Sequence, residues 1–155
     1  MGGSPLRIQL TLVPSAEASR EARRLLEAFP DLTPYPDLLF AAQLLTHELV
    51  TNSARHGNLP ADQPVRLMVE GDTETVSIQV AHGGSGFDAL AVLAEQYRRE
   101  ELYHGLFLLD ALADRWGFGC EDGCRISFEI DLVPGRRIWR GCELIPFVSA
   151  ASAIE

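Results

Sequence analysis

The order of hydrophobic periodicities along the chain constrains its fold more than any other sequence feature. Some segments alternate apolar and polar residues, as half-buried strands do, and others repeat apolar residues at helical spacing. The expected strands are 6–13, 65–70, 75–81, 117–120 and 125–132, and the expected helices are 15–29, 37–55, 88–101 and 105–116. Because hairpins join some strands and helices join others, we expect an α/β (α+β) fold, a two-layer sandwich with a mixed sheet and its helices on one face.

The chain of 155 residues is long enough for one domain with a substantial core. We expect this domain to occupy residues 1–133 and regard 134–155 as a C-terminal extension. The extension begins with a basic stretch, Arg136 to Arg140, and continues with mostly apolar residues. The sequence leaves open whether it is disordered, contacts a partner or forms an ordered flap.

The net charge is −9, from 13 basic and 22 acidic residues. This balance argues against general affinity for nucleic acid or for anionic membranes, which both require cationic surface. No apolar run approaches the length of a membrane span, and the N-terminus lacks the pattern of a signal peptide. We therefore expect a cytoplasmic location.

Three cysteines occur at irregular spacing: Cys120, Cys124 and Cys142. Cys120 and Cys124 flank a short segment that is typical of a hairpin turn, so they can face each other across two strands. An odd count is no disulfide framework, and a zinc site needs more ligands than the neighbouring sequence offers. We expect free thiols in a reducing compartment.

A polar stripe runs along the expected helix 37–55. Glu48, Asn52 and His56 recur at every fourth residue, a spacing that stacks side chains along one face of a helix. A carboxylate and an amide one turn apart suit hydrated magnesium, which prefers oxygen ligands and phosphate partners. The alternative is a solvent-exposed helix face, and for His56 it is a role in closing the helix C-terminus.

Two glycine-containing segments follow the stripe. His-Gly-Gly-Ser-Gly-Phe at 82–87 comes directly after an expected strand, and Gly105 begins an apolar helix. The first segment is either a ligand-binding loop or a flexible turn. At the far end of the apolar helix, we expect Trp116 to pack in the core and the pair Asp114-Arg115 to close the helix.

These three features occur in the order found in the GHKL ATPases, which include histidine kinases, DNA gyrase and anti-sigma factor kinases. The resemblance covers residues 6–133. The small size and the segment 110–117 resemble the anti-sigma factor serine/threonine kinases. The resemblance implies a Bergerat-type ATP-binding fold with a mostly antiparallel sheet, and a mobile lid over the nucleotide near 95–101, where a solvated charged face is the alternative.

By this resemblance, Glu48 and Asn52 match the first motif of the family, Glu-x-x-x-Asn. Asn52 is implied to bind Mg²⁺ through its side-chain oxygen, and Glu48 to act as general base toward the attacking hydroxyl. His56 also matches a residue common in the branch.

The resemblance assigns the glycine segments to the second and third motifs. Gly84 and Gly86 match the second motif, with Phe87 following as in many relatives. Gly105 matches the second glycine of the third motif. The backbone amides of Gly105 and Leu106, at the start of the helix, are implied to hold phosphate with the aid of the helix dipole.

Two positions depart from the family pattern. His82 occupies the place of the aspartate that accepts a hydrogen bond from the adenine amino group, and only a neutral histidine can accept. Tyr103 occupies the place of a glycine where backbone approaches phosphate, so its side chain can crowd the ligand. These departures bear on both implied cofactors, ATP and Mg²⁺.

Three functions follow from the resemblance. The first is an anti-sigma-factor-like regulator that binds ATP-Mg and phosphorylates Ser/Thr of an antagonist protein. The second, motivated by His82 and Tyr103, is a degenerate GHKL module with weak or no ATP binding that acts by protein–protein interaction. The third, a histidine kinase catalytic domain, is disfavoured by the short lid. The implied partners are a sigma factor, an antagonist protein and a second copy in a homodimer, with no direct nucleic acid and no membrane.

Overall fold

The computed structural model describes residues 6–13, 15–56, 63–83, 94–95, 98–99, 105–120 and 123–132. In this part of the chain the elements follow the predicted order. They are β1 (Leu6–Leu12), α1 (Ala16–Glu27), α2 (Pro36–His56), β2 (Val65–Gly71), β3 (Thr75–His82), α4 (Gly105–Leu112), β4 (Arg115–Cys120) and β5 (Cys124–Asp131).

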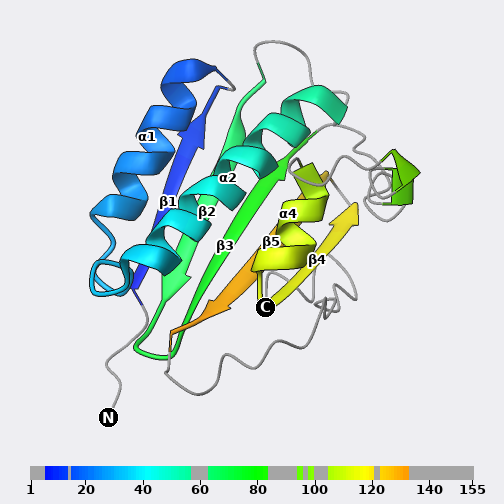
Figure 1. Cartoon of the computed structure of the whole chain (residues 1–155). Coiled ribbons are helices and arrows are strands. Elements are labelled where there is room, and N and C mark those ends of the chain that lie inside the picture. The colour runs from blue at the N-terminus through cyan, green and yellow to red at the C-terminus, as the bar shows by residue number, and fades with distance from the viewer. Residues whose placement is uncertain are drawn as a thin grey trace.

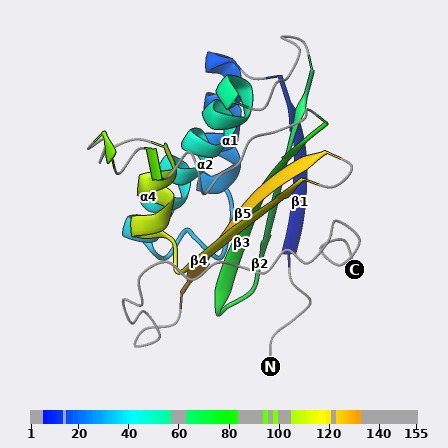
Figure 2. The same ribbon diagram turned by 90° about the vertical axis from the view of Figure 1, so that its right-hand side faces the viewer.

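The strands form one sheet in the order β1-β2-β3-β5-β4. All four pairings between the described strands are antiparallel, so the sheet is antiparallel here rather than mixed. Helices α1, α2 and α4 lie on the same face of the sheet (Figures 1 and 2). The predicted two-layer sandwich is therefore confirmed, and it has one helix-covered face and one outer face.

The core lies between the sheet and the helices. Val65, Leu67 and Val69 of β2 and Val76 and Ile78 of β3 alternate along their strands and are fully buried. Alternation at a period of two places all of them on the helix-covered face. Burial of each such side chain stabilises the fold by roughly 1.5–3 kcal/mol, so this layer sets the register of the central strands.

Helix α1 begins as predicted, after Ser15. The Ser15 hydroxyl accepts a hydrogen bond from the Ala18 backbone N–H at 3.1 Å, which satisfies one of the free donors at the helix start. The helix ends at Glu27, two residues before the predicted end. Phe29 is nevertheless fully buried, and its ring lies 2.8 Å from where a Cβ atom at Gly71 would be. Glycine at 71 thus admits the ring.

The predicted helix 105–116 is wrong in its last turn. Helix α4 ends at Leu112, and Arg115 and Trp116 belong to β4. The cause is pairing with β5: the Asp114 N–H donates to the Glu129 carbonyl at 3.0 Å, and the Asp131 N–H donates to the Asp114 carboxylate at 2.7 Å.

Arg115 completes this link between β4 and β5. Its guanidinium forms ion pairs with Asp131 and Glu129. The hydrogen bonds to Asp131 are the main reason that the pKa of Arg115 is raised above its ordinary value. The predicted role of Asp114 and Arg115 in closing a helix is therefore replaced by strand anchoring. Trp116 packs in the core as predicted, with no exposed surface.

The free-thiol interpretation is wrong for Cys124, which is disulfide-bonded in this structure. The register of the hairpin places Cys120 directly opposite Cys124, as the sequence suggested. Facing residues of an antiparallel pair have Cα atoms about 4.5–5.5 Å apart, within the range that a disulfide spans. The hairpin geometry thus permits the oxidised form.

Two features of the remaining described residues bear on the sequence expectations. Arg98 and Arg99 are exposed and both pair with Glu95, as a solvated charged face requires. Among the described helices, none has the length and apolar character needed to cross a membrane.

Candidate functional site

Helix α2 carries the predicted polar stripe and lies over the sheet. It is continuous from Pro36 to His56, so the backbone positions of Glu48, Asn52 and His56 fall on one stripe as predicted. The side chain of Glu48 is half-buried, and that of its neighbour Leu49 is buried in the core. The side chains of Asn52 and His56 are outside the described part. The helix therefore presents Glu48 at the margin of the core.

His82 is the last residue of β3 and is 5% exposed. Burial lowers its pKa below the ordinary value of 6.5, because the protonated ring loses hydration inside the protein. The imidazole is therefore neutral at pH 7. A neutral ring has one nitrogen that accepts a hydrogen bond and one that donates.

Helix α2 and the end of β3 meet at a small cavity. Ser53 of α2 and His82 of β3 both line it, together with Cys124 at the start of β5. Its volume is about 10 Å³, room for roughly one water molecule. Ser53 is 3% exposed, so two buried polar side chains from distant parts of the sequence share this cavity.

The backbone after His82 is held by close packing with the β4–β5 hairpin. Gly123 has φ of +99°, and a Cβ atom there would lie 2.6 Å from the His82 carbonyl oxygen. A side chain at 123 would therefore be strained and would also clash. Gly83 is exposed, and a Cβ atom on it would lie 2.9 Å from the Gln63 amide nitrogen.

Helix α4 is the third segment of the site, and α2 packs against both α4 and β3. Gly105 is its first residue, so the backbone N–H groups at 105 and 106 lack helical acceptors. The Leu106 side chain is fully buried in the core. Only the backbone of Leu106 is thus suited to the predicted phosphate contact.

Among the described residues, α2 contacts both β3 and α4, the elements that end or begin at two of the selected positions. Glu48 lies on α2, His82 ends β3 and Gly105 begins α4, and α2 and α4 lie on the helix-covered face of the sheet (Figure 1). The other predicted site residues, Gly84, Gly86, Phe87 and Tyr103, lie outside the described residues.

Sequence reasoning missed Thr46 and Ser53. Both lie on the buried face of α2, and the Thr46 hydroxyl is buried without a hydrogen-bond partner in the described part of the chain. A signal for them exists, because they occupy apolar positions of the helix pattern seven residues apart. Ser53 is the functional candidate of the two, since it shares the cavity of His82.

The family described as the histidine kinase-like ATPase domain matches residues 12–125. The chain therefore belongs to the histidine kinase-like ATPase domain family, the GHKL superfamily that the motifs indicated. No curated protein matches the chain. By its general class, this protein is therefore a GHKL-type ATP-binding regulatory module. The matched range includes Glu48, His82 and Gly105.

The donors and acceptors of His82 and Ser53 match those of an adenine edge, but the cavity that they share has room for only about one water molecule. The adenine edge offers an amino donor and a ring-nitrogen acceptor, and the neutral His82 ring and the Ser53 hydroxyl can each donate and accept. The described residues hold no group of three His, Cys, Asp or Glu side chains for a metal. A magnesium ion here would depend on Asn52, water and phosphate oxygens, as is usual for Mg²⁺.

We expect the free energy of unfolding to fall as pH drops from about 7 to about 5, in part because of His82. Its folded-state pKa is lowered, so below about pH 6.5 the unfolded chain binds a proton that the folded chain does not. Protonation therefore favours unfolding, and stability rises with pH through this window. Urea denaturation at several pH values measures the slope.

The control for this prediction is His82→Asn, which cannot titrate. Its stability should depend less on pH than that of the natural chain over the same window. Equal slopes in the two proteins would contradict the buried, neutral state of His82.

Proposed function

We propose that this protein is an anti-sigma-factor-like regulator that binds ATP-Mg and phosphorylates Ser/Thr of an antagonist protein. Its partners in this proposal are a sigma factor and the antagonist, and it acts as a homodimer in the cytoplasm. The single observation that best supports the proposal is the packing of α2, which carries Glu48, against both β3, which ends at His82, and α4.

Each segment has a distinct role in the proposed reaction. His82 would accept a hydrogen bond from the adenine amino group, and the backbone N–H groups at 105 and 106 would hold phosphate oxygens. Asn52 would place the metal. Bound ATP with magnesium supplies the activated phosphoryl group, so the protein contributes mainly positioning and electrostatic stabilisation.

Glu48 would act on the acceptor. Its carboxylate would orient the serine or threonine hydroxyl and take its proton as the phosphorus–oxygen bond forms, the role of a general base. The side chain of Glu48 is half-buried, so part of it is accessible to an acceptor.

A second candidate function is a degenerate module that acts by protein–protein contact alone. The observation that favours it is the buried imidazole of His82 at the place of a carboxylate. A neutral acceptor makes a weaker hydrogen bond to the adenine amino group than a carboxylate does.

Calorimetry with ATP and Mg²⁺ separates the two functions. Saturable heat that requires both ATP and the metal supports the nucleotide-binding regulator. No heat at millimolar nucleotide, with the protein folded by circular dichroism, refutes that function and leaves the degenerate module.

His82→Asp is expected to raise the affinity for ATP by about tenfold, since a charge-assisted hydrogen bond is roughly twice as strong as a neutral one. The measurement is the dissociation constant by calorimetry in saturating Mg²⁺. His82→Asn is the matched control, because asparagine has the shape of aspartate but a neutral oxygen acceptor. We expect it to raise the ATP affinity little. An aspartate variant that binds no better than the asparagine variant would refute the adenine-contact role of position 82.

A further inference from the structure

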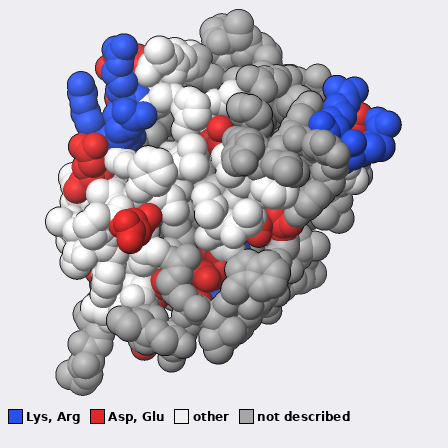
Figure 3. Space-filling view, viewed as in Figure 1, with Lys and Arg blue, Asp and Glu red and all other residues white. Residues whose placement is uncertain are grey.

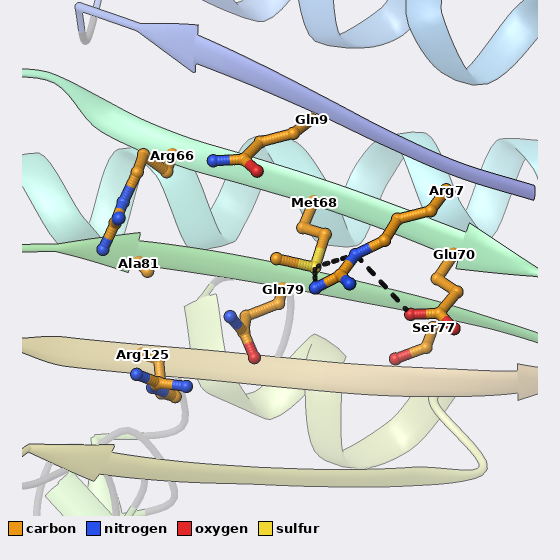
Figure 4. A pocket seen from close by; sticks show the side chains of 9 residues that line it. All are labelled: Arg7, Gln9, Arg66, Met68, Glu70, Ser77, Gln79, Ala81 and Arg125. Atoms are coloured by element: carbon orange, nitrogen blue, oxygen red, sulfur yellow. Dashed lines mark hydrogen bonds and ion pairs between the residues drawn. The ribbon is translucent and has the colours of Figure 1, made fainter. Parts of the chain in front are cut away.

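The outer face of the sheet contains a polar hollow with an excess of positive charge. Its volume is about 350 Å³, and side chains from β1, β2, β3 and β5 line it, on the opposite side of the sheet from the helices (Figure 4). The lining residues are Arg7, Gln9, Arg66, Met68, Glu70, Ser77, Gln79, Ala81 and Arg125. Three arginines and one glutamate give this set a charge of +2, in a chain whose net charge is −9.

Only one of the three arginines has a local partner. Arg7 donates hydrogen bonds to the Met68 sulfur at 3.0 and 3.2 Å and lies 3.9 Å from the Glu70 carboxylate. Arg66 and Arg125 have neither a hydrogen bond nor an ion pair from their side chains in the described part of the chain. The excess charge of the hollow is therefore concentrated at these two residues.

Arg66 and Arg125 flank a small residue in one row across three strands. The register pairs Arg66 with Ala81 and Ala81 with Arg125. Adjacent strands lie about 4.8 Å apart, so the two Cα atoms are about 10 Å apart with only a methyl group between them. Two guanidinium groups at this separation can both bind one carboxylate. The small side chain of Ala81 between them leaves room for it (Figure 4).

The rest of the hollow suits a peptide rather than a simple anion. Gln9 and Gln79 both line it, and each side-chain amide can donate to and accept from a peptide group. Met68 lies between them in the register, where a flexible thioether adapts to different side chains.

We propose that this hollow binds an acidic segment of a partner protein, with Arg66 and Arg125 holding a carboxylate above Ala81. Charge complementarity supports this occupant, because an acidic partner is repelled by most of an acidic protein and attracted to this face. On the helix-covered face, basic side chains stand beside acidic ones (Figure 3), as in the pairs of Arg20 with Glu17 and Arg98 with Glu95. Nucleic acid is a poorer fit, because the two unpaired arginines among the described residues of the hollow neutralise few phosphates, and the chain has a net charge of −9.

The arginine pair lies at the same end of the sheet as the candidate nucleotide site. Ala81 and Arg125 directly precede and follow the paired residues His82 and Cys124 in the register. A segment held on the outer face would thus lie beside the strand that ends in His82. The proposed binding itself does not require nucleotide, so it goes beyond the proposed kinase function.

The test is fluorescence anisotropy with a labelled glutamate-rich synthetic peptide and the whole chain, without ATP. The natural protein should bind the peptide saturably and more weakly as ionic strength rises. Arg66→Gln and Arg125→Gln should each weaken binding by about tenfold, the loss expected for one charge-assisted hydrogen bond. Arg23→Gln is the matched control, since Arg23 is exposed on α1, away from the hollow, and it should bind as the natural chain does.

Four results would overturn the proposal. They are the absence of saturable binding, equal binding of a peptide with every glutamate replaced by glutamine, equal loss in the Arg23 control, and displacement by a single-stranded oligonucleotide at lower concentration than by unlabelled peptide. Analytical ultracentrifugation adds a fifth: a dimer that dissociates in the Arg66→Gln variant means that a second copy covers this face. Because none of these measurements uses ATP, they do not depend on the kinase function.

Discussion

Replacing Glu48 with alanine should abolish phosphoryl transfer while leaving most of the ATP affinity intact. Loss of a general base costs roughly 10²–10⁴-fold in rate. ATP binding should survive, because the proposed contacts with the adenine ring and the phosphates come from β3 and α4 and not from the Glu48 carboxylate. The measurement is the rate of ADP formation in saturating ATP and Mg²⁺ with a serine- and threonine-containing protein or peptide as acceptor, together with the dissociation constant of ATP.

Two variants sharpen this prediction. Glu48→Gln keeps the size and hydrogen-bonding capacity of the side chain but cannot take a proton, so it should be as inactive as the alanine variant. Glu27→Ala removes an exposed carboxylate at the end of α1 and should leave the rate unchanged. Normal turnover in either Glu48 variant refutes the base role, and inactivity of only the alanine variant assigns Glu48 to positioning.

The sequence predicted those parts of the fold that local periodicity determines. Helix α2 and strands β2 and β3 lie where the spacing of apolar residues placed them, to within one residue at each end. The end of α4 was missed because Leu106 to Ala113 continue an apolar helical pattern toward Trp116. The bonds that pull residue 114 onward into a strand come from residues 129 and 131, and local spacing does not contain that information.

The candidate site was predictable in the same uneven way. The spacing of Glu48 and Asn52 and the position of His82 after a strand were visible in the sequence. The burial of His82 was not, since the residues that share its cavity, such as Ser53 and Cys124, are distant from it in the chain. Ser53 was missed because one small polar residue on an apolar helix face resembles an ordinary core position, and the cavity that gives it meaning exists only after folding.

The core prediction with the largest effect concerns Trp116. Trp116→Ala should lower the free energy of unfolding by about 3–5 kcal/mol, a large share of the 5–15 kcal/mol typical of a domain. Trp116 has no exposed surface and faces the fully buried Phe128 across the β4–β5 pair. Urea denaturation followed by circular dichroism measures the change, since a second tryptophan at 139 complicates fluorescence.

The tryptophan also connects the edge of the sheet to α4. Its indole N–H donates to the Asp110 carboxylate at 3.3 Å, and Asp110 lies on the helix whose first residues are proposed to hold phosphate. Trp116→Phe keeps most of the ring volume and loses this bond, so it should cost only about 1–3 kcal/mol. If this hydrogen bond orients α4, the folded phenylalanine variant should bind ATP more weakly than the natural protein does, under conditions where both are fully folded. An alanine variant within about 1 kcal/mol of the natural chain would show that the sheet edge does not depend on Trp116, because cavities of this size are costly in close-packed cores.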